Sequence, residues 1–93
     1  MRLKEFEIEA IKSSVKKYDE NSRVFLFGSR TDDTKKGGDI DILIISDKIK
    51  NKEIRKIRLG IFDLIGEQKI DIISSPLLSS AFIEYAYQSG IRL

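Results

Sequence analysis

Cysteine and histidine are both missing from this chain of 93 residues, and each absence removes a class of function. Without cysteine there is no disulfide framework, and nothing indicates an oxidising compartment. Without histidine, a Ser-His-Asp or Cys-His catalytic unit and a His-ligated zinc site are excluded. Acid–base chemistry and metal binding must therefore depend on Asp, Glu, Lys, Arg or Tyr.

Long apolar runs are missing too. No stretch is long enough to cross a membrane, and the N-terminal sequence MRLKEFEIEA has acidic residues where an export signal needs an apolar core. We therefore expect a cytoplasmic protein with no membrane partner. The formal charge of +2, from 17 basic and 15 acidic residues, is too balanced to predict direct nucleic-acid binding. The basic residues between 48 and 58 are read as a solvated helix face, with contact to an acidic partner or a nucleic acid as the alternative.

The length predicts a single domain, residues 1–93, with a thin core. Hydrophobic residues make up 41% of the chain, which is enough for one layer of helices packed on a sheet. No room is left for a second lobe that could hold a large acceptor. If the protein is an enzyme, we expect its second substrate to arrive with a partner.

Hydrophobic spacing predicts six elements in the order helix, strand, strand, helix, strand, helix. The helices are expected at residues 3–19, 51–65 and 77–89, and the strands at residues 24–27, 39–46 and 69–74. Gly66 and Gly90 are expected to end the last two helices, and Pro76 to open the third. The predicted fold class is α/β (α+β), a small mixed sheet of at least three strands covered by helices as a single layer pair.

Two acidic residues, Asp39 and Asp41, lie at the start of the second predicted strand. Side chains two residues apart point to the same face of a strand, so the two carboxylates are expected together, with Ile40 on the opposite face. Like charges this close resist ionising together, and a divalent cation relieves the repulsion. Mg²⁺ suits such a pair because it prefers oxygen ligands. A solvated strand end with two exposed acids is the alternative.

Two weaker signals flank this pair. Gly28-Ser29 follows an apolar strand, where glycine lets the backbone approach a ligand and a helical turn can bind phosphate oxygens. A plain turn with a serine cap is the alternative. Asp71 lies near the start of the third predicted strand and can join the acidic pair if the two strands are neighbours. The alternative is an edge-strand acid that discourages aggregation.

In combination, the segments FGSR, GGDIDILI and KIDII resemble the nucleotidyltransferase superfamily of the DNA polymerase β type. The shortness of the chain narrows the resemblance to the minimal nucleotidyltransferases, the antitoxin half of HEPN–MNT toxin–antitoxin pairs. The resemblance covers residues 24–73, with a helix on either side, and implies the nucleotidyltransferase fold.

The resemblance also implies roles for the matching residues. The implied nucleotide-binding residues are Gly28, Ser29 and Arg30, and the implied catalytic and metal-binding residues are Asp39, Asp41 and Asp71. Two Mg²⁺ ions would clamp the attacking and leaving oxygens, and Asp71 would also activate the acceptor hydroxyl. The implied reaction moves AMP from ATP to a hydroxyl on a partner protein, by family analogy a tyrosine of a HEPN toxin.

Other interpretations stay open beside this one. Thr31-Asp32-Asp33 replaces the small, basic and glycine residues that many members carry there, and the linker to Asp39 is slightly shorter. Acids near a triphosphate favour a binding module that neutralises its partner through complex formation, with an inactive site. A phosphatase of the haloacid-dehalogenase type is a third reading, but there the acidic pair follows an apolar strand, and here Ile42 to Ile45 come after it. Pairing into a homo-oligomer, through a sheet edge or the last helix, is also open.

Overall fold

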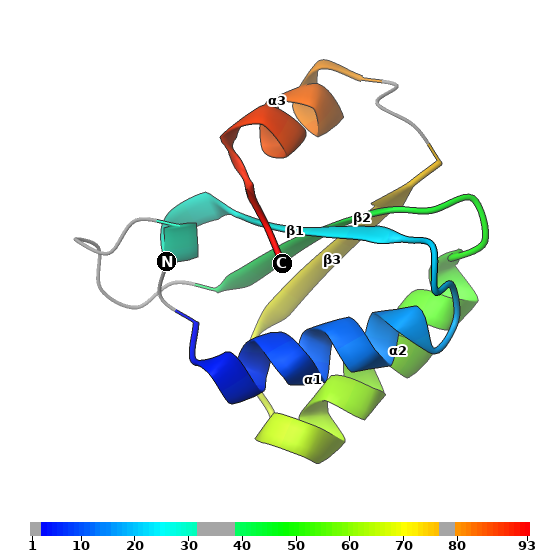
Figure 1. Cartoon of the computed structure of the whole chain (residues 1–93), viewed down its shortest axis with the longest axis vertical. Coiled ribbons are helices and arrows are strands. Elements are labelled where there is room, and N and C mark those ends of the chain that lie inside the picture. Colours follow the sequence, from blue (N-terminus) through cyan, green and yellow to red (C-terminus); the bar gives the residue numbers. More distant parts are fainter. Residues whose placement is uncertain (1–2, 32–38, 77–79) are drawn as a thin grey trace.

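The computed structural model describes residues 3–31, 39–76 and 80–93, which form a four-stranded sheet with helices on both faces (Figure 1). In chain order the elements are α1 (Glu5–Lys16), β1 (Arg23–Phe27), the short 3₁₀ turn η1 (Gly28–Thr31), β2 (Ile40–Ile45), α2 (Asn51–Ile65), β3 (Ile70–Ser75), α3 (Ala81–Ser89) and β4 (Ile91–Arg92). The predicted fold class, a mixed sheet covered by helices, is confirmed. None of the helices in the described ranges combines the length and apolar character that a bilayer span requires.

The strand order across the sheet is β3-β2-β1-β4. Strand β1 is antiparallel to both of its neighbours, β2 and β4, whereas β2 and β3 run parallel. A parallel pair needs a long crossover, and α2 supplies it. The start of β2 and the start of β3 therefore lie side by side, next to the end of β1.

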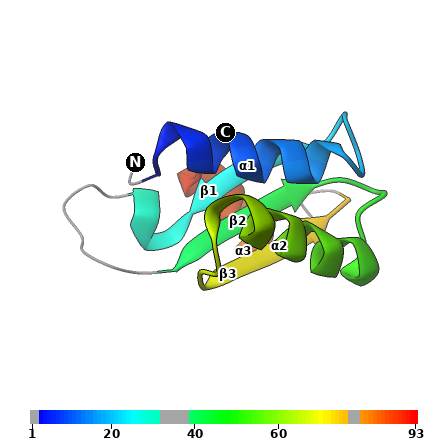
Figure 2. The same ribbon diagram turned by 90° about the horizontal axis from the view of Figure 1, so that it is seen from below.

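One face of the sheet is covered by α1 and α2, which lie in front of it in Figure 2. Strand β2 contributes Ile40, Ile42 and Ile44 to this face, and none of the three is exposed to solvent. They pack with Ile11 and Val15 of α1. Further fully buried side chains from α2 are Ile57 and Ile61. This layer holds most of the core, as the apolar spacing of the two helices predicts.

The opposite face carries α3, so a second and smaller helical layer is added to the single layer pair expected from the composition. Leu43 and Ile45 point to this side of β2 and pack with Ile83 and Ala86 of α3. An edge-on contact joins Phe25 of β1 to a tyrosine of α3, with the ring centroids of Phe25 and Tyr87 at 4.9 Å. Because α3 is short, it covers only part of this face.

The helix ends follow local chemistry. In α1 and α2 a glutamate in the first turn accepts a hydrogen bond from the backbone N–H that precedes the helix, Glu7 from Lys4 at 2.9 Å and Glu53 from Lys50 at 2.8 Å. Gly66 ends α2 with a positive φ of 88°, as predicted. Helix α1 is shorter than the predicted 3–19.

Two predictions at the C-terminal end need correction. Pro76 does not open the last helix: α3 begins at Ala81, because Ser80 Oγ caps it by accepting from the N–H of Ile83 at 3.2 Å. Residues 77–79, where that prediction also fell, lie outside the described residues. The sequence pattern also missed β4, whose two residues are too few to show an alternation.

A buried polar link holds the end of the sheet where β1 begins and β2 ends. Ser46 Oγ donates to Asp19 Oδ2 at 2.5 Å and accepts from the N–H groups of Lys48 and Ile49 at 3.1 and 3.2 Å. The other oxygen of Asp19 accepts from the N–H of Asn21 at 3.1 Å. The turn after α1 and the turn after β2 are thus fastened to each other.

Candidate functional site

The chain turns sharply at Gly28, at the end of β1 that lies beside the starts of β2 and β3. Gly28 has a φ of 78°, in the left-handed region that favours glycine. A Cβ there would collide with Oδ2 of Asp41 and lie 3.2 Å from its Cγ. The glycine therefore serves the fold twice, since it accepts the backbone angle and leaves room for the carboxylate of Asp41.

The acidic side chains Asp41 and Asp71 lie directly opposite each other. Register pairs Asp41 of β2 with Asp71 of β3, and Phe27 of β1 faces Asp41 from the other side. Ile40 and Ile42 point into the α1–α2 core, so Asp41 between them points to the face that carries α3. Asp71 is placed on this face in the same way, between Ile70 and Ile72. The two strands are neighbours, which is the condition on which Asp71 was expected to join the acidic pair.

The carboxyl groups at this edge change the ionisation of Asp41. Partial burial raises the pKa of the Asp41 carboxyl above its ordinary value, and the negative charges of Asp71 and Asp39 raise it further. A hydrogen bond between the Asp41 and Asp71 carboxyl groups acts in the same direction. A cation placed here would relieve the repulsion that these carboxylates exert on one another.

Asp39 lies just before β2 and has a partner of its own. The backbone N–H of the next residue, Ile40, donates to the carbonyl of Lys69 at 3.1 Å, which brings residues 39 and 69 alongside each other. Asp39 Oδ2 lies 3.5 Å from Lys69 Nζ, and the lysine side chain is 78% exposed. The sequence analysis missed Lys69. Lys69 precedes Asp71 by two residues, as Asp39 precedes Asp41, so pairing Asp41 with Asp71 places Lys69 opposite Asp39.

Magnesium can be tested against this arrangement. Within residues 3–31, 39–76 and 80–93, no group of three or more acidic side chains is arranged to hold a metal ion. Mg²⁺, however, is commonly held by one or two carboxylates together with substrate phosphates, and Asp41 and Asp71 provide such a pair. Asp39 can add a third oxygen donor if it leaves Lys69, and an exposed ion pair costs at most about 1 kcal/mol to break. The donor chemistry therefore fits Mg²⁺.

The other predicted nucleotide contacts, Ser29 and Arg30, lie in η1. Residues 28–31 form a 3₁₀ turn, so the expected helical turn after Gly28 is present, and Thr31 Oγ1 closes it by donating to the carbonyl of Gly28 at 2.7 Å. The side chains of Ser29 and Arg30 lie outside the described part of the chain. Asp32 and Asp33, the departures from the family pattern, lie outside it as well.

The site is thus an acidic edge where three strands meet, with a glycine turn beside it. The sequence-predicted residues Gly28, Asp39, Asp41 and Asp71 come together there from three separate segments of the chain. Paired carboxylates at a strand end, opposite a glycine turn, suit a phosphate-bearing substrate that brings a metal ion with it.

Comparison with known proteins agrees with this geometry. No protein of curated function matches the chain. The family model described as polymerase beta, nucleotidyltransferase matches residues 9–93, a span that includes every residue of the acidic edge and the glycine turn. The chain therefore belongs to the polymerase beta nucleotidyltransferase family.

Proposed function

We propose that this domain transfers AMP from ATP to a hydroxyl on a partner protein, a tyrosine of a HEPN-type toxin, and so acts as an antitoxin. The observation that carries the proposal is the register of Asp41 with Asp71, which sets two carboxylates against each other beside Gly28. Membership in the nucleotidyltransferase family supports the reaction class. The acceptor and the nucleotide come from the resemblance to the minimal nucleotidyltransferases.

Each residue has a proposed task. Asp41, Asp71 and Asp39 would hold Mg²⁺, two ions in the complete site, and the metal would neutralise charge on the transferred phosphate. Gly28, Ser29 and Arg30 would hold the triphosphate. Asp71, the more exposed member of the pair, would take the proton of the acceptor hydroxyl.

In the proposed reaction the acceptor oxygen forms a bond to the α-phosphorus of ATP. The bond from that phosphorus to the bridging oxygen breaks, and pyrophosphate leaves. The chain's own contribution is to position the reactants and to balance their charge, which is most of what phosphoryl-type transfer requires. No histidine is needed, in keeping with the composition.

The first experiment titrates the purified protein with ATP by calorimetry, with and without Mg²⁺. Wild type is compared with an Asp39→Asn/Asp41→Asn variant and with Asp47→Asn, an exposed acid beyond the far end of β2. We expect Mg²⁺-dependent binding in wild type and Asp47→Asn, and its loss in the double variant. The second step incubates each protein with labelled ATP and a HEPN-type partner and measures label on the partner's tyrosines. Equal labelling by wild type and the double variant would contradict the proposal.

A second candidate function is neutralisation of the partner by binding alone. The observation that favours it is the sequence Thr31-Asp32-Asp33, which sets two acids directly after the residues assigned to the triphosphate. The exposed ion pair between Asp39 and Lys69 adds only a weak competitor for the metal. In this case the Asp39→Asn/Asp41→Asn variant would still neutralise the toxin in growing cells, and wild type would show no Mg²⁺-dependent ATP binding. The two candidates therefore give opposite results with one variant.

A further inference from the structure

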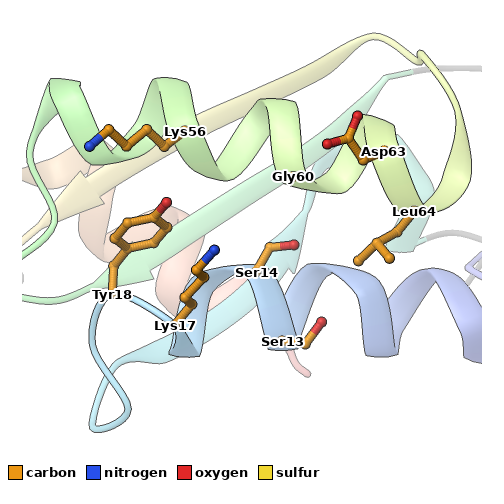
Figure 3. Close-up of a pocket in the computed structure, with 8 residues that line it drawn as sticks. All are labelled: Ser13, Ser14, Lys17, Tyr18, Lys56, Gly60, Asp63 and Leu64. Carbon is orange, nitrogen blue, oxygen red and sulfur yellow. The ribbon is translucent and has the colours of Figure 1, made fainter.

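A groove runs between α1 and α2 on the side of these helices that faces away from the sheet (Figure 3). It consists of two adjoining hollows of about 290 and 390 Å³ that share Ser13 and Leu64 as lining residues. The two helices are antiparallel, so Lys17, just after α1, lines the same end of the groove as Lys56 in the first half of α2 (Figure 3). At the other end of the groove, Phe6 of α1 lies with Leu64 of α2.

Large apolar side chains are exposed at one end of this groove. Phe6 is 57% exposed and Leu64 is 61% exposed, and both line the same hollow. Ile11 and Val15 of α1 are completely buried in the core, whereas Phe6 and Leu64 of the same helix layer line the groove and stay exposed. Clustered exposed apolar side chains of this kind mark contact surfaces.

The charges along the groove are divided between its ends. In the first hollow, Lys17 and Lys56 lie at one end and Asp63 lies at the other, beside Leu64 (Figure 3). Glu9 lines the second hollow with Phe6. Among the described residues, the one basic group in contact with the Phe6 ring is Lys4, whose Nζ lies 5.9 Å from the ring centroid. A surface with a basic end and an acidic end is complementary to itself when one copy is turned end for end over another. This charge pattern therefore favours a second copy of the same surface as the partner.

The middle of the groove is built of small residues. Ser13 and Ser14 of α1 lie here beside Gly60 of α2, where an added Cβ would be 3.5 Å from Ser14 Oγ. Small side chains at the midpoint allow another helix layer to approach closely, while larger groups at the ends reach across.

We propose that the occupant of this groove is a second copy of the chain, and that the protein forms a two-fold symmetric dimer through α1 and α2. Two orientations of the axis bring the grooves face to face. An axis parallel to the helices would place Lys17 and Lys56 over the lysines of the second copy. An axis across the helices, near Ser13 and Gly60, places the basic end of each copy over the acidic end of the other, and the charges select this one.

In this dimer, Lys56 lies four residues before Gly60 and Asp63 lies three after it, so each Lys56 meets Asp63 of the second copy. Phe6 and Leu64 pack against Tyr18 and the aliphatic stem of Lys17, two residues that line the groove of the second copy. The acidic edge at Asp41 and Asp71 points to the other side of the sheet, so each copy keeps its site accessible.

The test measures the mass of the purified chain by sedimentation equilibrium over a range of concentrations. We expect a dimer, twice the 10.7 kDa of one chain. Leu64→Glu should raise the dissociation constant by about tenfold or more. Leu59→Glu is the matched control, because Leu59 lies on the same helix and is 58% exposed but does not line the groove. Circular dichroism checks that both variants fold.

A charge exchange tests the symmetry. Lys56→Glu and Asp63→Lys should each weaken the dimer, because each sets like charges against one another. A mixture of the two variants should dimerise again, since Glu at 56 then meets Lys at 63 in one contact and the native pair remains in the other. A wild-type chain that stays monomeric, a Leu59→Glu variant that dissociates as far as Leu64→Glu, or a mixture that fails to recover would each overturn the proposal.

Discussion

The carboxylate of Asp41 fills the space that a side chain at residue 28 would need. Gly28→Ala should therefore destabilise the fold by about 1–3 kcal/mol, through both the strained φ and the collision. Gly66→Ala is the matched control, because Gly66 also has a positive φ, of 88°, but no atom lies within 4 Å of the added Cβ. Urea unfolding of both variants measures the difference, and equal losses would show that Asp41 is not pressed against Gly28.

Removing one charge from the acidic edge should stabilise the metal-free protein. The negative charges of Asp71 and Asp39 repel the carboxylate of Asp41, so Asp41→Asn relieves repulsion within the folded state. We expect its melting temperature to rise by about 2–5 °C in the presence of EDTA. Adding Mg²⁺ with ATP should raise the melting temperature of wild type and leave that of the variant unchanged. A variant that melts below wild type in EDTA would contradict the repulsion.

The link between Asp19 and Ser46 predicts a loss of stability in acid. The hydrogen bond from Ser46 is the main cause that lowers the pKa of Asp19 below 3.8; burial opposes it, and Asn21, Lys48 and Lys16 assist it. Because the folded state favours the ionised form, this contribution is present above the unfolded pKa and is lost as the pH falls through the lower folded pKa. The free energy of unfolding should therefore drop below about pH 4.

Ser46→Ala removes the donor of that hydrogen bond and should cost about 1.5–3 kcal/mol at neutral pH. The variant should also lose part of the acid-dependent drop that Asp19 causes. Chemical denaturation at a series of pH values measures both effects, with Asp47→Asn as a control at the exposed neighbouring acid. An acid-dependent drop as steep in Ser46→Ala as in wild type would rule out this origin.

Gly90 holds the end of α3 against β1. A Cβ at this residue would lie 2.6 Å from the carbonyl oxygen of Ala86 and 2.9 Å from that of Leu26. Gly90→Ala should cost about 1–3 kcal/mol, since neither backbone oxygen can move away freely. Gln88→Ala, at an exposed position of the same helix, should change stability by less than about 0.5 kcal/mol. Thermal melts of the two variants compare these effects directly.

The elements with long apolar patterns could be predicted from the sequence. The predicted helix at residues 51–65 matches α2 in full, because its apolar residues recur on one helical face. The strand predicted at residues 39–46 contains β2, because a strand buried on both faces reads as a nearly continuous apolar run. The pairing of Asp41 with Asp71 was predicted only on condition that the two strands are neighbours. Periodicity identifies elements and not their order, so the resemblance to a family was needed for that step.

Other features depend on contacts between distant segments. Asp19 and Ser46 lie 27 residues apart, and no sequence pattern around either residue predicts their contact. The ion pair of Lys69 with Asp39 follows from register, which becomes known only once β2 and β3 are placed. The start of α3 was misplaced because proline and serine both favour helix starts, and the cap at Ser80 prevails.

The residues of the acidic edge all come from β1, β2, β3 and the turns beside them. Strand β4, in contrast, pairs with β1 through Phe25 and Arg92, which are far apart in the sequence. Closing a short loop loses less chain entropy than closing a long one, so β1 with β2, and β2 with β3 through α2, should pair early in folding. Strand β4 should join last and open first. Hydrogen exchange at the β4 amides would then be faster than in β2, and a molecule with β4 detached would keep Asp41 and Asp71 aligned.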